Sequence, residues 1–249
     1  MQQPFSENVL YHDYNQERYD MPRFFAEIED KNHAVIKGKD AHHIQGPLRK
    51  KIGDELFIRD NTTGYLARIS SIASRQISLE ILRSQELSER GTTTVHLGMS
   101  LIDLKDMDAL IRTVTELGVA DIYPLIAERS NIRSISDTRR DRWNNIIKEA
   151  VKQCERRTIP RIYDPLPLMQ GIHTIAESWQ CKLVASQNAG TSLCDCKADD
   201  IGILIGPEGG FSSLEIDEML SSGFTPVSMG RTVMRAVTAA IAAAGILGM

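Results

Sequence analysis

The segment Gly206-Pro-Glu-Gly-Gly-Phe-Ser212, which follows the apolar run Ile201-Gly-Ile-Leu-Ile205, decides the fold of this chain. A second segment of the same kind, Met229-Gly-Arg-Thr-Val-Met-Arg-Ala236, follows Val227-Ser228. Each pattern is typical of a buried strand, a glycine-containing loop and the start of a helix. Two such loops at the carboxyl edge of a parallel sheet form a crevice lined by backbone amides, where α/β proteins hold cofactors.

The first loop has residues that allow a ligand to approach the backbone closely. Gly206-Pro207 ends the strand, and Gly209-Gly210 can take positive φ. Ser212 and Glu215 have the spacing of a capping box at the start of a helix. Glu208 disfavours a phosphate ligand, because its carboxylate would repel the anion, and favours hydroxyls, an amine or a cationic centre. The glycines alone are equally typical of an ordinary tight connection.

Charge is distributed unevenly along the 249 residues, whose formal net charge is −4. The negative net charge of the whole chain argues against a nucleic-acid partner. Residues 37–51, however, carry five bases and one acid, and residues 129–161 carry ten bases and four acids. Phosphate binding needs local clusters of this kind rather than a basic whole. The alternative is that both segments are the solvated faces of ordinary elements.

The sequence lacks a membrane span, a secretory signal and cysteines at zinc spacing, which bears on the compartment and the metal content of the protein. No stretch approaches the roughly 18 to 20 apolar residues of a membrane span, and the first residues lack the basic and apolar regions of a secretory signal. Cys194-Asp-Cys196 has no second Cys or His pair at zinc spacing. We therefore expect a cytoplasmic protein with reduced thiols, no membrane association and no metal.

Three regions follow from the pattern along the chain. Residues 1–20 are polar and acidic, which predicts a poorly ordered extension or a docking arm. Residues 21–90 read as short strands with turn signals, which favours a small β-barrel. Residues 91–249 alternate strands and helices, which predicts an α/β domain with a parallel sheet covered on both faces. Within it we expect strands near 94–101, 121–126, 182–186, 201–205 and 225–229, and helices over 107–117 and 137–155.

The two loop segments resemble the sequence motifs of the bacterial 16S rRNA uracil-N3 methyltransferase family. This family belongs to the SPOUT superfamily of S-adenosylmethionine-dependent RNA methyltransferases. The resemblance covers most of the chain through further segments in order: Met21-Pro-Arg-Phe-Phe, His42 to Asp54, Thr115 to Val119, and Asp141-Arg-Trp143 with Glu149, Gln153, Arg156 and Pro160. Four positions depart from the family pattern, which has lysines near Asp103 and Thr113, a serine at Cys154 and a glutamate at Val237.

The resemblance implies a fold, an activity and partners. It implies a PUA-like RNA-binding barrel at the N-terminus, a SPOUT-type sheet with a trefoil knot over about 180–249, and a homodimer. It implies methylation of uracil N3 in 16S rRNA of the small ribosomal subunit, with S-adenosyl-L-methionine as cofactor. The alternatives are a SPOUT methyltransferase with another RNA target and a non-catalytic RNA-binding assembly factor.

The resemblance and the local chemistry together give three sets of candidate site residues. Arg235, just before the last helix, could stabilise a uracil oxygen as negative charge develops, or form a surface or dimer salt bridge. Glu208 could assist proton removal or position the cofactor. These two are the predicted catalytic residues. Predicted cofactor-binding residues are Gly206, Pro207, Glu208, Gly209, Gly210, Met229, Gly230, Val233, Met234 and Ala236, although Val233 and Met234 could equally pack in the core. Predicted RNA-binding residues are Arg23, His42, Arg49, Lys50, Lys51 and Arg156.

Overall fold

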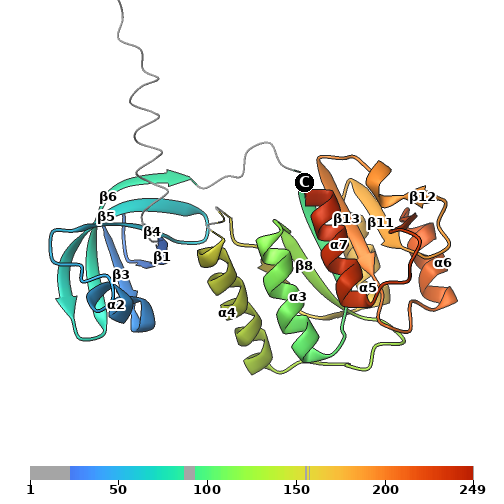
Figure 1. Ribbon diagram of the computed structural model, residues 1–249, viewed down its shortest axis with the longest axis horizontal. Coiled ribbons are helices and arrows are strands. Elements are labelled where there is room, and N and C mark those ends of the chain that lie inside the picture. Colours follow the sequence, from blue (N-terminus) through green and yellow to red (C-terminus); the bar gives the residue numbers. More distant parts are fainter. Residues whose placement is uncertain (1–22, 87–92, 155, 157, 249) are drawn as a thin grey trace, which may run out of the picture. The chain divides into compact units, whose positions relative to one another are not determined.

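The computed structural model describes residues 23–86, 93–154, 156 and 158–248 (Figure 1). The chain divides into two compact units, residues 1–88 and 89–249, each described here by itself. The predicted extension at residues 1–20 lies outside the described residues. Within the described part of the chain, no helix is long and apolar enough to cross a membrane. The same residues contain no cluster of three or more His, Cys, Asp or Glu side chains placed to hold a metal ion.

The N-terminal unit is a curled six-stranded sheet. Its strands are β1 (Arg23–Phe25), β2 (Glu27–Ile28), β3 (His33–Lys37), β4 (Glu55–Arg59), β5 (Thr63–Ala73) and β6 (Gln76–Glu86). They run in the order β1-β4-β5-β6-β3-β2, antiparallel except for the β1–β4 pair. The two edge strands, β1 and β2, are separated only by Ala26, so the edges meet and the sheet forms a nearly closed barrel. This confirms the predicted small barrel.

One helix in this unit was not expected. Residues 38–45 form α2 (Gly38–Gln45), whereas the pattern of residues 21–90 predicts short strands and no helix. Gly38 has φ +68, which turns the chain sharply away from β3. Ala41 and Ile44, three residues apart on one helical face, are then buried in the barrel core. The two histidines consequently lie at the exposed end of a short helix.

The C-terminal unit contains a parallel sheet of eight strands in the order β10-β8-β7-β13-β11-β14-β12, with β9 paired to β8. This confirms the predicted α/β class. The strands are β7 (Thr94–Ser100), β8 (Asp121–Ile126), β9 (Arg161–Ile162), β10 (Leu166–Pro167), β11 (Cys181–Ala185), β12 (Thr191–Ser192), β13 (Asp200–Ile205) and β14 (Thr225–Ser228). The trefoil knot in this unit stays a prediction.

Five α-helices and one short 3₁₀ helix are described in this unit. They are α3 (Leu104–Glu116), α4 (Asp137–Gln153), α5 (Leu168–Ala176), the 3₁₀ turn η1 (Leu193–Asp195), α6 (Ser213–Ser221) and α7 (Ala236–Gly248). Figure 1 shows α3, α4 and α7 side by side. The core around Trp179 contains residues of α5 and α6. Gly202 in β13 makes room for that indole, because a Cβ there would overlap the ring. Since the strands are parallel, the loops after β7, β8, β11, β13 and β14 all leave the same edge of the sheet.

Candidate functional site

The loop after β13 is a tight turn that ends in a capped helix. The amide of Gly210 donates to the carbonyl oxygen of Pro207 at 2.8 Å, and Gly210 has φ +68. Of the two glycines that can take positive φ, only Gly210 has it. Ser212 and Glu215 form the predicted capping box at the start of α6, with both reciprocal hydrogen bonds present. Glu208 is exposed at the turn, so its carboxylate is free to meet a ligand.

Arg129 and Glu215 hold this turn in place, and the contacts that they make with Gly209 and with Glu128 were not predicted. Arg129, in the loop after β8, donates from Nη1 to the carbonyl oxygen of Gly209 at 2.8 Å. Glu215 is buried, and its carboxylate accepts from the amide of Ser212 at 2.8 Å and from the amide of Glu128 at 2.7 Å. The first loop is therefore fixed to the loop after β8 at two points, which leaves its outer surface preorganised.

The loop after β14 presents apolar side chains and backbone amides. Val233 is 74% exposed, which rejects core packing for this side chain, while Met229 and Met234 are half-buried. Gly230 has φ +124, a conformation that favours glycine. Among the described residues, the amides of Val233, Met234 and Arg235 have no hydrogen-bond acceptor. This loop can therefore offer both donors and apolar contacts to a ligand.

Arg235 stands where the second loop becomes α7. Its carbonyl oxygen accepts from the amide of Ala239 at 2.9 Å, and its side chain is exposed. No ion pair to Arg235 is present within the described residues. The first amides of α7, a helix of 13 residues, point back toward this end. Arg235 thus adds a free guanidinium to a set of unpaired backbone donors.

The sheet places the two loops on either side of one strand. β11 pairs with β13 through Val184 and Leu204, and with β14 through Ala185 and Val227. The loops at Gly206 and Met229 therefore flank the carboxyl end of β11. The predicted cofactor-binding residues are brought to one sheet edge, where they supply amides, a carboxylate and thioether or aliphatic surface. This donor set suits a ligand with both an apolar ring and polar groups.

In the N-terminal unit, four of the predicted RNA-binding residues gather at one end of α2. His42 lies in the last turn of α2, and the following loop packs back onto it, since Lys50 donates its amide to the carbonyl oxygen of Ile44 at 3.0 Å. Arg49 has φ +50 and is exposed, as is Lys51. His43 instead makes an edge contact with Phe24, with ring centroids 6.0 Å apart, which supports a packing role for it. Arg23 lies in β1.

Arg156 does not have the position expected of an RNA contact. It is 8% exposed, and its Nη1 donates to the carbonyl oxygens of Thr115 at 3.1 Å and Val119 at 2.6 Å. These carbonyls belong to the C-terminal end of α3 and the chain just after it. The guanidinium therefore donates to carbonyl oxygens at the end of a helix, inside the C-terminal unit. This geometry does not support the predicted RNA contact of Arg156.

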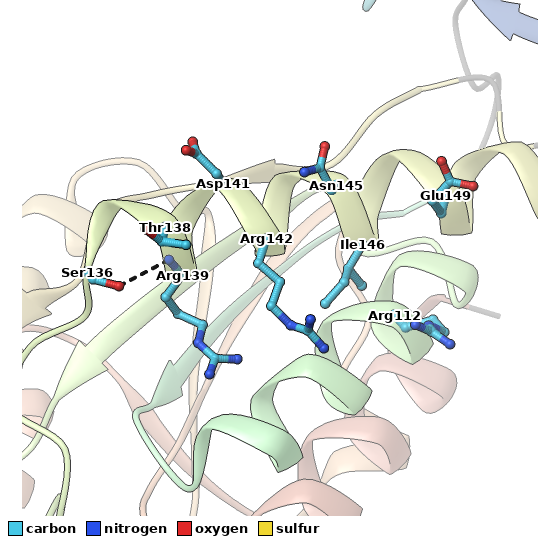
Figure 2. Close-up of a pocket in the computed structure, with 9 residues that line it drawn as sticks. All are labelled: Arg112, Ser136, Thr138, Arg139, Asp141, Arg142, Asn145, Ile146 and Glu149. Atoms are coloured by element: carbon cyan, nitrogen blue, oxygen red, sulfur yellow. Dashed lines mark hydrogen bonds between the residues drawn. The ribbon is translucent and has the colours of Figure 1, made fainter. Parts of the chain in front are cut away.

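A basic groove lies away from both loops, between α3 and α4 (Figure 2). Its volume is about 670 Å³, and its lining residues are Arg112, Ser136, Thr138, Arg139, Asp141, Arg142, Asn145, Ile146 and Glu149. A smaller hollow of about 360 Å³ adjoins it, since Arg112 and Arg142 line both. Sequence reasoning noted the basic run 129–161 without placing this groove.

Comparison with known proteins identifies the class of this chain first. The model of the RNA methyltransferase domain family matches residues 89–248. Two solved structures with the same fold have S-adenosylmethionine bound. A putative methyltransferase from Legionella pneumophila is 29% identical, with a TM-score of 0.77 over 91% of this chain and 96% of that one. The ribosomal RNA small subunit methyltransferase E of Neisseria gonorrhoeae is 25% identical, with a TM-score of 0.76 over 90% of this chain and 95% of that one.

A curated relative narrows the class to one family. The ribosomal RNA small subunit methyltransferase E of Buchnera aphidicola subsp. Schizaphis graminum is 32% identical over 228 residues, which are 89% of this chain and 91% of the relative. The protein of the same name from Synechocystis is 30% identical over 80% of this chain and 67% of that relative. The chain belongs to the ribosomal RNA small subunit methyltransferase E family, which confirms the family that the motifs resembled.

Proposed function

We propose that this protein transfers the methyl group of S-adenosylmethionine to N3 of a uracil in 16S rRNA of the small ribosomal subunit. Membership of the methyltransferase E family supports this activity. The observation that carries the proposal is the pair of loops at Gly206 and Met229, which flank the end of β11. The Met229 loop adds unpaired amides and the exposed side chain of Val233. Two relatives of the same fold bind this cofactor.

The cofactor supplies a methyl group on a sulfonium sulfur, and the chain must hold it. The loop residues Gly206 to Gly210 and Met229 to Ala236 provide the contacts. Backbone amides meet the polar groups, and Met229, Val233 and Met234 cover the adenine. Glu208 binds hydroxyl groups at the exposed turn, consistent with a ligand that carries no phosphate. The contacts of Arg129 and Glu215 fix this site before the cofactor arrives, which lowers the entropic cost of binding.

The transfer step requires loss of the N3 imide proton and alignment of nitrogen with the methyl group. Negative charge develops on a uracil oxygen as the proton leaves. Arg235, always charged and exposed beside the unpaired amides, stabilises that oxygen. Glu208 either positions the cofactor through its hydroxyl groups or accepts the proton. Val237, in the first turn of α7, stands where the family pattern has a glutamate, so Arg235 lacks that neighbour here.

Partners follow from the same proposal. The cluster of His42, Arg49, Lys50 and Lys51 contacts rRNA phosphates, and Arg23 is proposed as a further contact. The small-residue helix α7 forms a homodimer contact, because Ile241, Ala242 and Ile246 are only half-buried in the single chain. Ribosomal RNA as substrate places the protein in the cytoplasm.

Nucleoside mass spectrometry of 16S rRNA from a strain that lacks this protein tests the proposal. We expect 3-methyluridine to disappear in the deletion strain and to return on complementation. A changed nucleoside other than 3-methyluridine would support another RNA target. Unchanged rRNA together with absent S-adenosylmethionine binding in calorimetry would support a non-catalytic assembly factor instead.

A further inference from the structure

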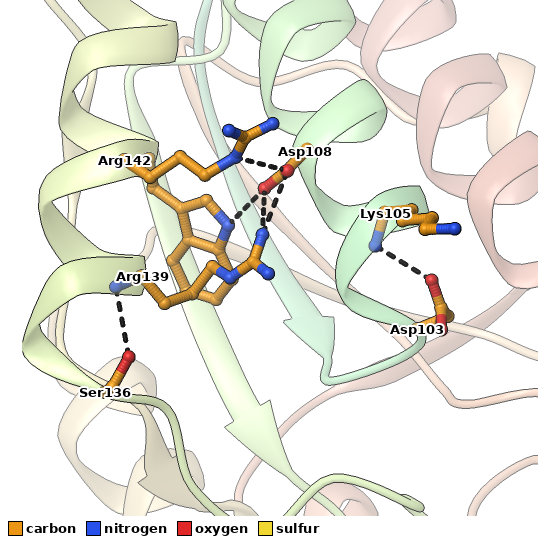
Figure 3. A network of polar contacts seen from close by, with 7 residues as sticks. Asp103, Lys105, Asp108, Ser136, Arg139 and Arg142 are labelled. Atoms are coloured by element: carbon orange, nitrogen blue, oxygen red, sulfur yellow. Dashed lines mark hydrogen bonds and ion pairs between the residues drawn. The ribbon is translucent and has the colours of Figure 1, made fainter.

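The groove between α3 and α4 is organised around one partly buried carboxylate (Figure 3). Asp108, whose side chain is 13% exposed, accepts from Arg139 Nη1 at 2.9 Å and from Arg142 Nε at 2.7 Å. It also accepts from Trp143 Nε1 at 3.0 Å. Burial on its own would raise the pKa of Asp108, but the hydrogen bonds and charges of the two arginines hold that pKa below its usual value. One negative charge therefore fixes two positive charges in place.

The contacts leave most of the guanidinium donors unused. Each guanidinium has five N–H donors. In the contacts that the structure describes, Arg142 uses Nε toward Asp108 and keeps both Nη groups, and its side chain is 61% exposed. In Figure 3 these Nη groups point away from Asp108. The result is a planar fork held in one orientation, which is the geometry that binds two oxygens of one phosphate.

A third arginine completes the basic wall. Arg112 lies on α3, one helical turn after Asp108, and lines both hollows with Arg142. It has no ion pair among residues 23–86, 93–154 and 158–248. Figure 2 shows Arg139, Arg142 and Ile146 pointing toward α3, whereas Asp141, Asn145 and Glu149 point away from it. The acids that line the groove thus lie at its outer rim, and Glu149 is already paired with Lys152 at 3.4 Å.

We propose that the α3–α4 groove is a second RNA-binding surface, in which Arg112, Arg139 and Arg142 bind backbone phosphates of the rRNA substrate. The proposal rests on the proposed function, because it takes rRNA as the ligand. On the side of the groove that faces α3, three guanidiniums stand against the single carboxylate of Asp108, whereas Asp141 and Glu149 lie at the rim. The three arginines contact phosphates rather than bases. They therefore add affinity for RNA and orient it without a preference for sequence. It would anchor the substrate on the methyltransferase unit itself, separately from the cluster at α2.

The test measures the salt dependence of binding to full-length 16S rRNA for the wild-type protein, Arg112→Ala, Arg142→Ala and the double variant. Loss of one phosphate contact lowers the slope of log Kobs against log[salt] by about 0.7 to 0.9. We expect each single variant to show that change and the double variant about twice as much. The ratio of the wild-type binding constant to that of the double variant would then fall about eightfold as the salt concentration rises from 50 to 200 mM.

Controls separate the groove from the fold and from general charge. Lys148 lies on α4, is exposed and lines neither hollow, so Lys148→Ala should keep the wild-type slope. Arg112→Ala removes none of the described ion pairs of Asp108, which are with Arg139 and Arg142. This variant therefore remains informative if Arg142→Ala lowers the melting temperature. Calorimetric affinity for S-adenosylmethionine should stay the same in all variants.

Two results would overturn the proposal. One is a wild-type slope in both folded single variants. The other is a wild-type slope accompanied by a change of oligomeric state in sedimentation, which would assign the groove to a second copy of the chain. Failure of the proposed function would give a different result. The salt slopes would still change in the variants, but the wild-type protein would form no 3-methyluridine.

Discussion

Arg129 Nη1 lies 2.8 Å from the carbonyl oxygen of Gly209, although 80 positions separate the two residues in the sequence. The contact joins the loop after β8 to the loop after β13. A Cβ at Gly209 would lie 3.4 Å from the Arg129 side chain, at van der Waals distance, so the two residues are close neighbours. The proposed cofactor site thus depends on a residue that itself has no place in the loop motifs.

Replacing Arg129 tests this dependence. We expect Arg129→Ala to raise the dissociation constant for S-adenosylmethionine about tenfold, because a hydrogen bond from a charged donor contributes about 1.5 kcal/mol. Calorimetry measures the effect, with Lys197→Ala, an exposed change outside the loops, as the control. Wild-type affinity in a folded Arg129→Ala protein would show that the loop holds its shape without the arginine.

The two glycines of the first loop should respond differently to substitution. Gly210→Ala strains the backbone, because its φ of +68 costs an alanine about 1 to 2 kcal/mol. Gly209→Val leaves φ allowed but adds two methyl groups beyond a Cβ that would already contact Arg129 at 3.4 Å, so it should weaken cofactor binding more than it lowers stability. Urea unfolding and calorimetry on both variants separate the effects. Equal losses of stability in the two proteins would contradict this assignment.

Glu215 should contribute to stability through both of its carboxylate oxygens. Glu215→Ala removes the capping box of α6 and leaves the amide of Glu128 without its acceptor. We expect a loss of about 2 kcal/mol in the free energy of unfolding. Asp217→Ala, an exposed change on the same helix, is the matched control and should cost far less. A small loss in Glu215→Ala would mean that water replaces these contacts.

The environment of His96 predicts a pH-dependent stability. Nε2 lies 3.0 Å from Asp200 Oδ2, within hydrogen-bond geometry. Nδ1 lies 2.9 Å from Asp121 Oδ2, but the angle of this second contact is outside that of a good hydrogen bond. Burial lowers the pKa of His96, but the two carboxylates together raise it above the ordinary value. Their stabilising effect is therefore complete below a pH of about 6.5, the pKa of an unfolded histidine, and is lost as pH rises through the folded pKa.

Urea unfolding at pH 6 and at pH 8 checks this sign. The wild-type protein should lose more stability than His96→Gln over that interval, because the variant has no imidazole to deprotonate. An equal loss in both proteins would assign the pH dependence to other groups.

Arg235 should affect turnover without affecting cofactor binding. In Arg235→Lys the point charge of the lysine cannot reproduce the two-pronged contact of a guanidinium, so single-turnover methyl transfer should fall by at least tenfold. Cofactor affinity and melting temperature should stay the same, and Val237→Glu should retain or raise the rate. A parallel loss of stability and activity would instead indicate a structural salt bridge.

The sequence predicted what depends on local pattern. The apolar run bounded by glycines predicted β13, and the spacing of Ser212 and Glu215 predicted the start of α6, because these signals lie within a few residues. Two-residue strands such as β9 carry no such pattern. The helix α2 was missed because its buried face consists of only Ala41 and Ile44.

Tertiary contacts explain the remaining differences at the site. Arg129 and Asp108 have partners 80 and more than 30 positions away, and no local spacing encodes such pairs. Arg156 follows a basic helix and is a predicted RNA contact, yet its guanidinium is buried against carbonyl groups at the end of α3 and just after it. Charge in a sequence does not reveal which arginines the fold uses internally.

Methyl transfer with purified components tests the central claim most directly. The purified protein is incubated with S-adenosylmethionine and small ribosomal subunits from the deletion strain, and the nucleosides of 16S rRNA are analysed by mass spectrometry. The account predicts that 3-methyluridine forms with the wild-type protein and is strongly reduced with Arg235→Lys. Tight S-adenosylmethionine binding without 3-methyluridine, in either intact subunits or free 16S rRNA, would contradict it.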